Sequence, residues 1–162
     1  MSARIAALTQ YLQLEPHPEG GFFKETYRSE ELLHSPDFGG SRNLLTNIYF
    51  LLTAGSFSAF HRISSDELWN FHEGATGIIH VLHHQGGYTK INLGAVIEAG
   101  ETFQAVIHAG DWFASETTGD YSLVGCAVAP GFDFKDFEMA DRAKLLLAFP
   151  DYSEIIERLT RN

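Results

Sequence analysis

The feature that most constrains the fold is a series of short, strand-like segments between Asn43 and Val128. Each segment is rich in β-branched and aromatic residues, and each is separated from the next by a turn that contains Gly or Asp. The turns recur at the spacing of roughly 8–12 residues that is typical of antiparallel sandwiches and barrels. We therefore predict an all-β fold with strands over residues 44–53, 56–63, 67–72, 76–83, 88–93, 102–107, 111–115 and 122–129.

Short helices are expected at both ends of this β-region. Ser2 can cap a helix whose apolar positions include Ile5 and Leu8 and which ends before Pro16. A strand is expected over 22–28, a loop over 33–42, a helix over 138–147, and a last helix capped by Ser153. The predicted organisation is a single domain over residues 1–162, with a barrel core at roughly 43–130 and a helical tail at 138–160.

Composition excludes several classes of function. The chain has a formal charge of −10 with only 11 Lys and Arg residues, which argues against a nucleic-acid partner. The single cysteine, Cys126, lies in an apolar run and suits a buried thiol in a reducing compartment. No segment is long and apolar enough to span a bilayer, and no signal-like sequence begins the chain, so we expect a cytoplasmic protein without a membrane partner.

One motif brings chemically useful side chains together. From Gly55 to Gly74 the chain has a histidine, His61, six residues before a glutamate, Glu67. Because residues two apart in a strand share a face, His61 lies with Ile63, and Glu67 lies with Trp69 and Phe71. The sequence thus predicts one small-molecule cavity that combines an imidazole, a carboxylate and an aromatic wall.

This stretch resembles the first motif of the cupin superfamily. Further segments match a small single-domain subfamily of uncharacterised cupins, the Cupin_5 type: 19–21, 25–28, 48–52, 61–69 and 128–137. The resemblance implies an RmlC-like jelly-roll barrel, a homodimer, and a structural relationship to sugar-nucleotide 3,5-epimerases. The strand over 22–28 could then lie at a subunit interface, or Tyr27 and Arg28 could reach the pocket.

The resemblance also raises the question of a metal ion. Cupin motifs normally supply four ligands, but Ile63 and Phe113 stand where two of the histidines are expected. Only His61 and Glu67 remain, with Gln104 and His108 as conceivable additional ligands. Since two protein ligands rarely hold a transition metal tightly, no tightly bound metal is expected, and the cofactor is otherwise unknown.

The candidate site therefore consists of His61 and Glu67 as catalytic or metal-binding residues within an aromatic pocket. The expected pocket residues are Tyr49, Ile63, Trp69, Phe71, Gln104, Trp112 and Phe113. The aromatic side chains could equally be ordinary core residues, because any barrel must fill its interior.

Three functions remain open from sequence. The first is an isomerase or epimerase that uses His61 and Glu67 on a sugar-derived or other small polar substrate, with the carboxylate raising the basicity of the imidazole. The second is a non-catalytic module that binds a small-molecule ligand, with His61 and Glu67 simply hydrogen-bonded to each other. The third is a metal-dependent enzyme such as a dioxygenase.

Overall fold

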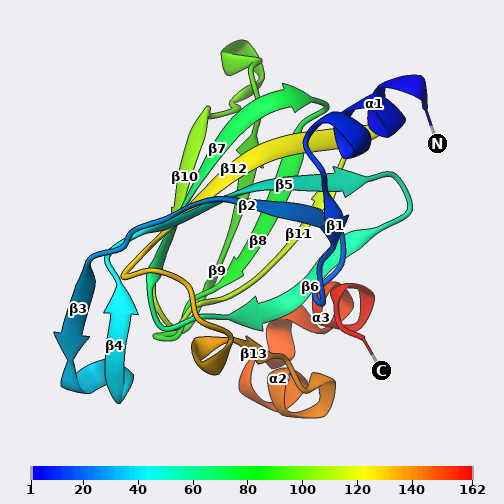
Figure 1. Cartoon of the computed structure of the whole chain (residues 1–162). Helices are drawn as coiled ribbons and strands as arrows, with labels where there is room; N and C mark the ends of the chain where they lie inside the picture. Colours follow the sequence, from blue (N-terminus) through cyan, green and yellow to red (C-terminus); the bar gives the residue numbers. More distant parts are fainter. Residues whose placement is uncertain (1, 162) are drawn as a thin grey trace.

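Two antiparallel sheets face each other across an apolar core in the computed structural model, which describes residues 2–161 (Figure 1). The six-stranded sheet has the order β1 (Glu15–Pro16), β2 (Phe22–Arg28), β5 (Thr46–Thr53), β12 (Tyr121–Ala129), β7 (Asp66–Gly74) and β10 (Gln104–Ile107). The five-stranded sheet has the order β13 (Glu138–Met139), β6 (Phe57–Arg62), β11 (Trp112–Thr117), β8 (Gly77–Leu82) and β9 (Tyr88–Leu93). The predicted all-β jelly-roll barrel is confirmed.

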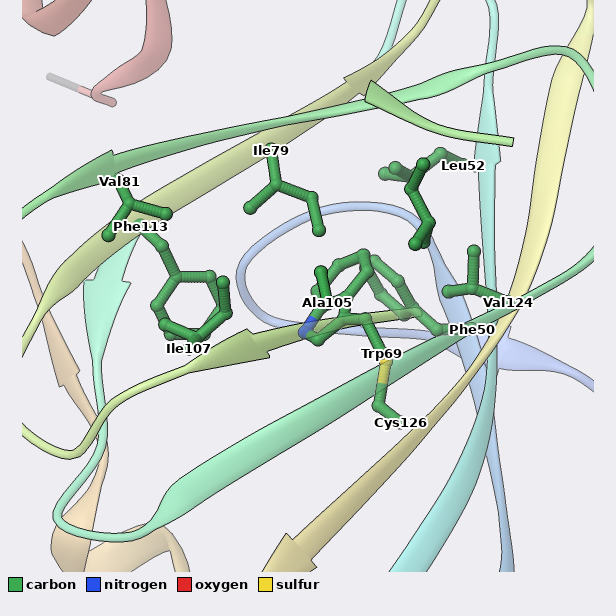
Figure 2. Packing of buried hydrophobic residues seen from close by; sticks show 11 residues of the cluster. Phe50, Leu52, Trp69, Ile79, Val81, Ala105, Ile107, Phe113, Val124 and Cys126 are labelled. Atoms are coloured by element: carbon green, nitrogen blue, oxygen red, sulfur yellow. The ribbon is translucent and has the colours of Figure 1, made fainter. Parts of the chain in front are cut away.

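The core lies between the sheets because alternate residues of each strand point inward. Figure 2 shows Trp69 and Phe50 of the six-stranded sheet packed towards Ile79 and Phe113 of the five-stranded sheet. The rings of Phe50 and Trp69 meet edge to face, with their centroids 5.7 Å apart. This packing fills one end of the barrel and leaves the other end for a cavity.

The helix at the N-terminus forms as predicted. Helix α1 (Ala3–Tyr11) begins after Ser2, whose hydroxyl oxygen accepts a hydrogen bond of 3.3 Å from the Ile5 amide. Its Ile5 and Leu8 side chains pack on Leu51 and Leu123, on the outer face of the six-stranded sheet.

The C-terminal helices differ in detail from the prediction. The helix expected over 138–147 is wrong in its first part, because Glu138 and Met139 pair with β6 as strand β13. Helix α2 (Arg142–Ala148) begins only after Asp141, whose carboxylate accepts from the Lys144 amide. Helix α3 (Ser153–Leu159) starts at Ser153 itself, so this residue is not the expected side-chain cap. Both helices pack on the outer face of the five-stranded sheet.

The loop predicted over 33–42 is largely a hairpin. Strands β3 (Leu32–Ser35) and β4 (Gly40–Asn43) pair in antiparallel fashion and project from the barrel (Figure 1). A short 3-10 helix at Pro36–Phe38 joins them, and Gly39 reverses the chain at a φ of +58°. The segment has the Pro and Gly residues of a turn, but the two flanking strands lack the alternation of apolar and polar residues that identifies strands.

No helix in residues 2–161 is long and apolar enough to cross a membrane.

Candidate functional site

A cavity of about 340 Å³ opens at one end of the barrel, between the inner face of the six-stranded sheet and strand β6. His61, Glu67 and Trp69 are buried in its walls, whereas the half-exposed Glu25 and Arg28 and the exposed Phe134 lie at its mouth. The segment from Phe132 to Phe137, which contains a 3-10 helix at Phe134–Asp136, forms one side of the opening. The remaining wall is mostly apolar: Phe23, Ile48, Phe50, Ile63, Cys126, Val128, Phe132 and Phe137.

His61 is held by two hydrogen-bonding contacts. Its Nδ1 lies 2.7 Å from the carbonyl oxygen of Ala59, and its Nε2 lies 3.0 Å from Oε2 of Glu19. The ring also packs against Phe113 at a centroid separation of 4.1 Å. Both nitrogens and one face of the imidazole are therefore fixed in position.

These contacts define where the protons lie. A carbonyl oxygen can only accept, so Nδ1 of His61 donates to Ala59. The contact between Nε2 and Glu19 then needs a second proton, which makes the two residues an imidazolium–carboxylate pair or its neutral tautomer. Burial disfavours the charged ring, but the charge and hydrogen bond of Glu19 outweigh it and raise the pKa of His61.

Glu19 is buried and well supplied with partners. Its Oε1 accepts a hydrogen bond of 2.8 Å from the Ser58 hydroxyl, while Oε2 faces His61. Burial opposes ionisation, yet the neighbouring His61 and His17 and the Ser58 bond together lower the pKa of this carboxyl. Glu19 is thus the charge partner that the His61 imidazolium needs.

His17 lies beside this pair in its neutral form. Its Nδ1 accepts a hydrogen bond of 3.3 Å from the Glu19 amide, and burial lowers its pKa. Its ring meets Phe23 edge to face at 4.7 Å. In the neutral ring the proton is consequently on Nε2.

The Glu67 carboxyl titrates in the neutral range. It is 8% exposed, and burial together with the negative charge of Glu19 raises its pKa to about 7, although His61 acts in the opposite direction. The Cys126 thiol and the Trp69 indole also oppose the shift. Burial in turn raises the pKa of Cys126, so the thiol stays protonated at neutral pH. Glu67 can therefore both accept and donate a proton near neutrality.

The loop between β1 and β2 carries His17 and Glu19 into the cavity. The Glu19 carbonyl accepts from the Ala59 amide at 2.9 Å, which ties the loop to β6. Gly20 adopts a φ of +112°, and a Cβ at this position would overlap the Phe57 carbonyl oxygen. Arg161 clamps the same loop from outside by donating to the Glu19 carbonyl at 3.0 Å.

Four residues of the predicted site do line the cavity: His61, Ile63, Glu67 and Trp69. The predicted hydrogen bond between His61 and Glu67 does not form, because the two ring nitrogens of His61 face Ala59 and Glu19 instead. His61 and Glu67 instead reach the cavity from different sheets, β6 and β7.

The other predicted pocket positions are corrected by the structure. Tyr49 and Trp112 point away from the cavity, because Phe50 and Phe113 take the inward positions next to them in their strands. Tyr49 lies instead under α1, and Trp112 stacks with Arg62 outside the barrel.

Phe71, Phe113 and Gln104 also lie outside the lining. Phe71 shares the face of Glu67, but it lies four residues further along β7, where it packs on the core. Phe113 is buried behind His61 and supports the imidazole. Gln104 is exposed on the edge strand β10 and donates to Asn70.

Sequence reasoning missed several lining residues, chiefly His17, Glu19 and Glu25. His17 lies in a segment without periodicity. Glu19 directly precedes two glycines, a signal of a constrained turn that could have drawn attention to it. Arg28, named as able to reach the pocket, lines its mouth, whereas Tyr27 is exposed outside it.

The cavity residues do not fit a transition-metal centre. Ile63 and Phe113 offer no ligand atom, and both nitrogens of His61 already face Ala59 and Glu19. Gln104 and His108, considered as further ligands, are exposed and outside the cavity. Within residues 2–161, no three or more His, Cys, Asp or Glu side chains are grouped so as to hold a metal ion.

Comparison with known proteins decides the family. The sequence profile described as "Cupin superfamily (DUF985)", Cupin_5, matches residues 6–140. The chain belongs to the Cupin_5 family. A yeast relative, the uncharacterized protein YML079W of Saccharomyces cerevisiae, is 34% identical, and the match covers 76% of this chain and 69% of the relative.

Solved structures agree with this assignment. A hypothetical protein from Leishmania major has a TM-score of 0.91 at 34% identity, with both chains fully covered. Protein SO0799 from Shewanella oneidensis has a TM-score of 0.87 at 40% identity, with 96% of each chain covered. Oxalate decarboxylase from Bacillus subtilis shares the fold at a TM-score of 0.58, with 14% identity over 89% of this chain and 36% of its own. Membership of the Cupin_5 family supports the binding of a small molecule.

Proposed function

We propose that this Cupin_5 protein is an isomerase or epimerase that moves a proton at a carbon next to a carbonyl group of a small polar substrate. The observation that carries the proposal is the pairing of two acid–base systems in one cavity. Glu67 has a pKa raised to about 7, and the His61–Glu19 pair holds a proton close by. Proton-transfer sites typically contain titratable groups whose pKa values are shifted apart by their surroundings in one pocket.

In the proposed reaction Glu67 removes the proton. Its carboxylate forms a bond to the hydrogen as the carbon–hydrogen bond breaks, and the electron pair moves to the carbonyl oxygen to form an enolate. The positive charge of His61 stabilises this enolate, because burial strengthens the attraction between them. His61 then supplies its Nε2 proton to the enolate, a step in which Nε2 exchanges its contact with Glu19 for one with the substrate, and the ring is left neutral with Nδ1 still protonated and donating to Ala59.

Glu67 and His61 lie in different sheets, which suits removal of a proton on one side of a substrate and its return on the other. His61 belongs to β6 in the five-stranded sheet, and Glu67 belongs to β7 in the six-stranded sheet. A planar enolate between them would lose its proton to one group and regain it from the other, which inverts a carbon centre. Glu19 acts as a positioning residue, since it holds the imidazole and favours its charged form.

Exchange of carbon-bound hydrogen in D₂O tests the proposal. We expect NMR screening of small hydroxycarbonyl compounds to find one whose proton next to the carbonyl is replaced by deuterium. His61→Ala should slow this exchange by about 10²–10⁴-fold while ligand binding persists. Binding without exchange in the wild-type protein would instead identify a non-catalytic binding module.

We also expect the isolated protein to lack a stoichiometric metal. Elemental analysis of protein purified without chelator should give well under about one transition-metal ion per chain, because too few ligands are free to hold one. Treatment with EDTA should leave both the melting temperature and the exchange reaction unchanged. A full equivalent of metal, lost together with activity on chelation, would favour the metal-dependent alternative.

A further inference from the structure

Each cation in the cavity already has its own carboxylate. At the mouth, Arg28 donates to both oxygens of Glu25 at 2.9 and 2.7 Å. Its remaining contacts are with the Asn43 side-chain oxygen at 2.8 Å and the Phe132 carbonyl at 3.1 Å. Deeper inside, His61 faces Glu19. No lysine is among the lining residues, and Asp133 adds a further carboxylate at the mouth.

Backbone amides at the mouth are also occupied. The Gly131 amide donates to the Asn43 carbonyl, and the Phe132 amide donates to the Thr46 hydroxyl at 2.9 Å. The amides of Lys135 and Asp136 both donate to Asp133, at 2.9 Å each. The 3-10 helix in this segment therefore presents no cluster of free N–H groups of the kind that binds phosphate.

What the cavity does offer suits an uncharged ligand. Its wall is largely aromatic and aliphatic, which accommodates the apolar face of a ring compound. The Glu67 carboxyl in the same wall supplies a polar partner for ligand hydroxyl groups. The volume of about 340 Å³ is suited to a small molecule.

We infer that the substrate is an uncharged hydroxycarbonyl compound of monosaccharide size, and that the paired cations and occupied amides of the cavity exclude its phosphorylated forms. This inference rests on the proposed proton-transfer function and specifies the substrate class of the same site. A phosphate or pyrophosphate group brings at least one full negative charge, and it needs unpaired cations or free amides to replace its water. The site would thus differ from one that takes sugar nucleotides.

Matched pairs of ligands test the substrate class. Saturation-transfer NMR would compare D-glucose, D-fructose and D-ribose with D-glucose 6-phosphate, D-fructose 6-phosphate and D-ribose 5-phosphate, with a dTDP-sugar as an additional ligand. We expect at least one free sugar to bind, and to bind at least about tenfold more tightly than its phosphate ester. Equal or tighter binding of a phosphorylated compound, or binding of no free sugar, would overturn the inference.

A variant that removes one negative charge at the mouth tests why phosphorylated compounds are excluded. Glu25→Gln releases the Arg28 guanidinium, so the variant should bind D-glucose 6-phosphate at least about tenfold more tightly than the wild type does. Glu138→Gln is the matched control, because it releases Arg62 in an exposed ion pair outside the cavity. No gain in Glu25→Gln, or the same gain in Glu138→Gln, would contradict the role of the paired Arg28.

The two proposals fail in distinguishable ways. A free sugar that binds but shows no deuterium exchange at any carbon would refute the proton-transfer function and leave the ligand class intact. A phosphorylated compound that binds and undergoes exchange would refute the ligand class and support the proton-transfer function.

Discussion

Replacement of Glu67 by glutamine is expected to slow deuterium exchange into the substrate by about 10²–10⁴-fold, because an amide cannot accept the substrate proton. The shape of the cavity should be retained, since the two side chains have nearly the same volume. Ligand affinity, measured by saturation-transfer NMR or calorimetry, should change far less than the exchange rate. A variant that exchanges the substrate proton at the wild-type rate would remove Glu67 from the proposed mechanism.

The same substitution is expected to stabilise the fold in mildly alkaline solution. The pKa of Glu67 is raised from 4.5 to about 7 in the folded protein, so the unfolded chain releases this proton more readily than the native state does. The contribution of Glu67 to stability is therefore fully present below the unfolded pKa, and it is lost as the pH rises through about 7. A shift of this size corresponds to about 3 kcal/mol, which Glu67→Gln should recover above about pH 8.

Urea unfolding at several pH values measures this effect. The difference in free energy of unfolding between Glu67→Gln and wild type should grow from near zero in acid to its full size above about pH 8. Glu98→Gln is a suitable control, because Glu98 is exposed on a short 3-10 helix far along the chain from the site. A pH-independent difference, or the same pH dependence in Glu98→Gln, would show that Glu67 is not a buried carboxyl with a raised pKa.

Gly20→Ala is expected to destabilise the protein by about 3–5 kcal/mol and to abolish exchange activity. The new methyl group would meet the Phe57 backbone carbonyl at a φ of +112°, and the obstacle is backbone that cannot turn aside. The loop that carries Glu19 must therefore move away from β6, and the contact between Glu19 and His61 is lost with it. Chemical unfolding and the exchange assay measure the two effects.

Gly87→Ala separates steric overlap from backbone strain. Gly87 also has a positive φ, of +98°, but no atom of residues 2–161 beyond its two chain neighbours lies within 4 Å of a Cβ placed there. We expect this variant to lose only about 1–2 kcal/mol and to keep its activity. Equal losses for the two variants would mean that close packing of the Gly20 loop on β6 does not hold the site.

The sequence could predict which residues of one strand point into the cavity together, because side chains alternate between the two faces of a strand. His61 and Ile63, like Glu67 and Trp69, are two residues apart, and all four line the cavity. Tyr49 and Trp112 were misplaced because each is adjacent to another aromatic residue, and composition does not show which of the two faces inward. The correct choice depends on strand register, which the pairing of β5 with β12 and of β11 with β8 fixes.

Partners distant in sequence could not be predicted from periodicity. Glu19 and Ser58 are 39 residues apart, and Arg28 and Phe132 are 104 residues apart. Their contacts depend on the path of a glycine turn and of the segment after β12, neither of which has a regular repeat. The sequence therefore predicts Glu67 as the carboxylate partner of His61, because its strand position lies on the same face as Trp69, whereas Asp66 next to it points to the opposite face.

A titration of the glutamate side chains by NMR tests the proton-transfer site most directly, because it needs no substrate. With ¹³C-labelled glutamate, we predict one side-chain carboxyl that titrates near the value of about 7, and whose signal is missing in Glu67→Gln. If every glutamate carboxyl of the folded protein titrates below about 5, close to the ordinary value, Glu67 is ionised at neutral pH and the proposed proton transfer is contradicted.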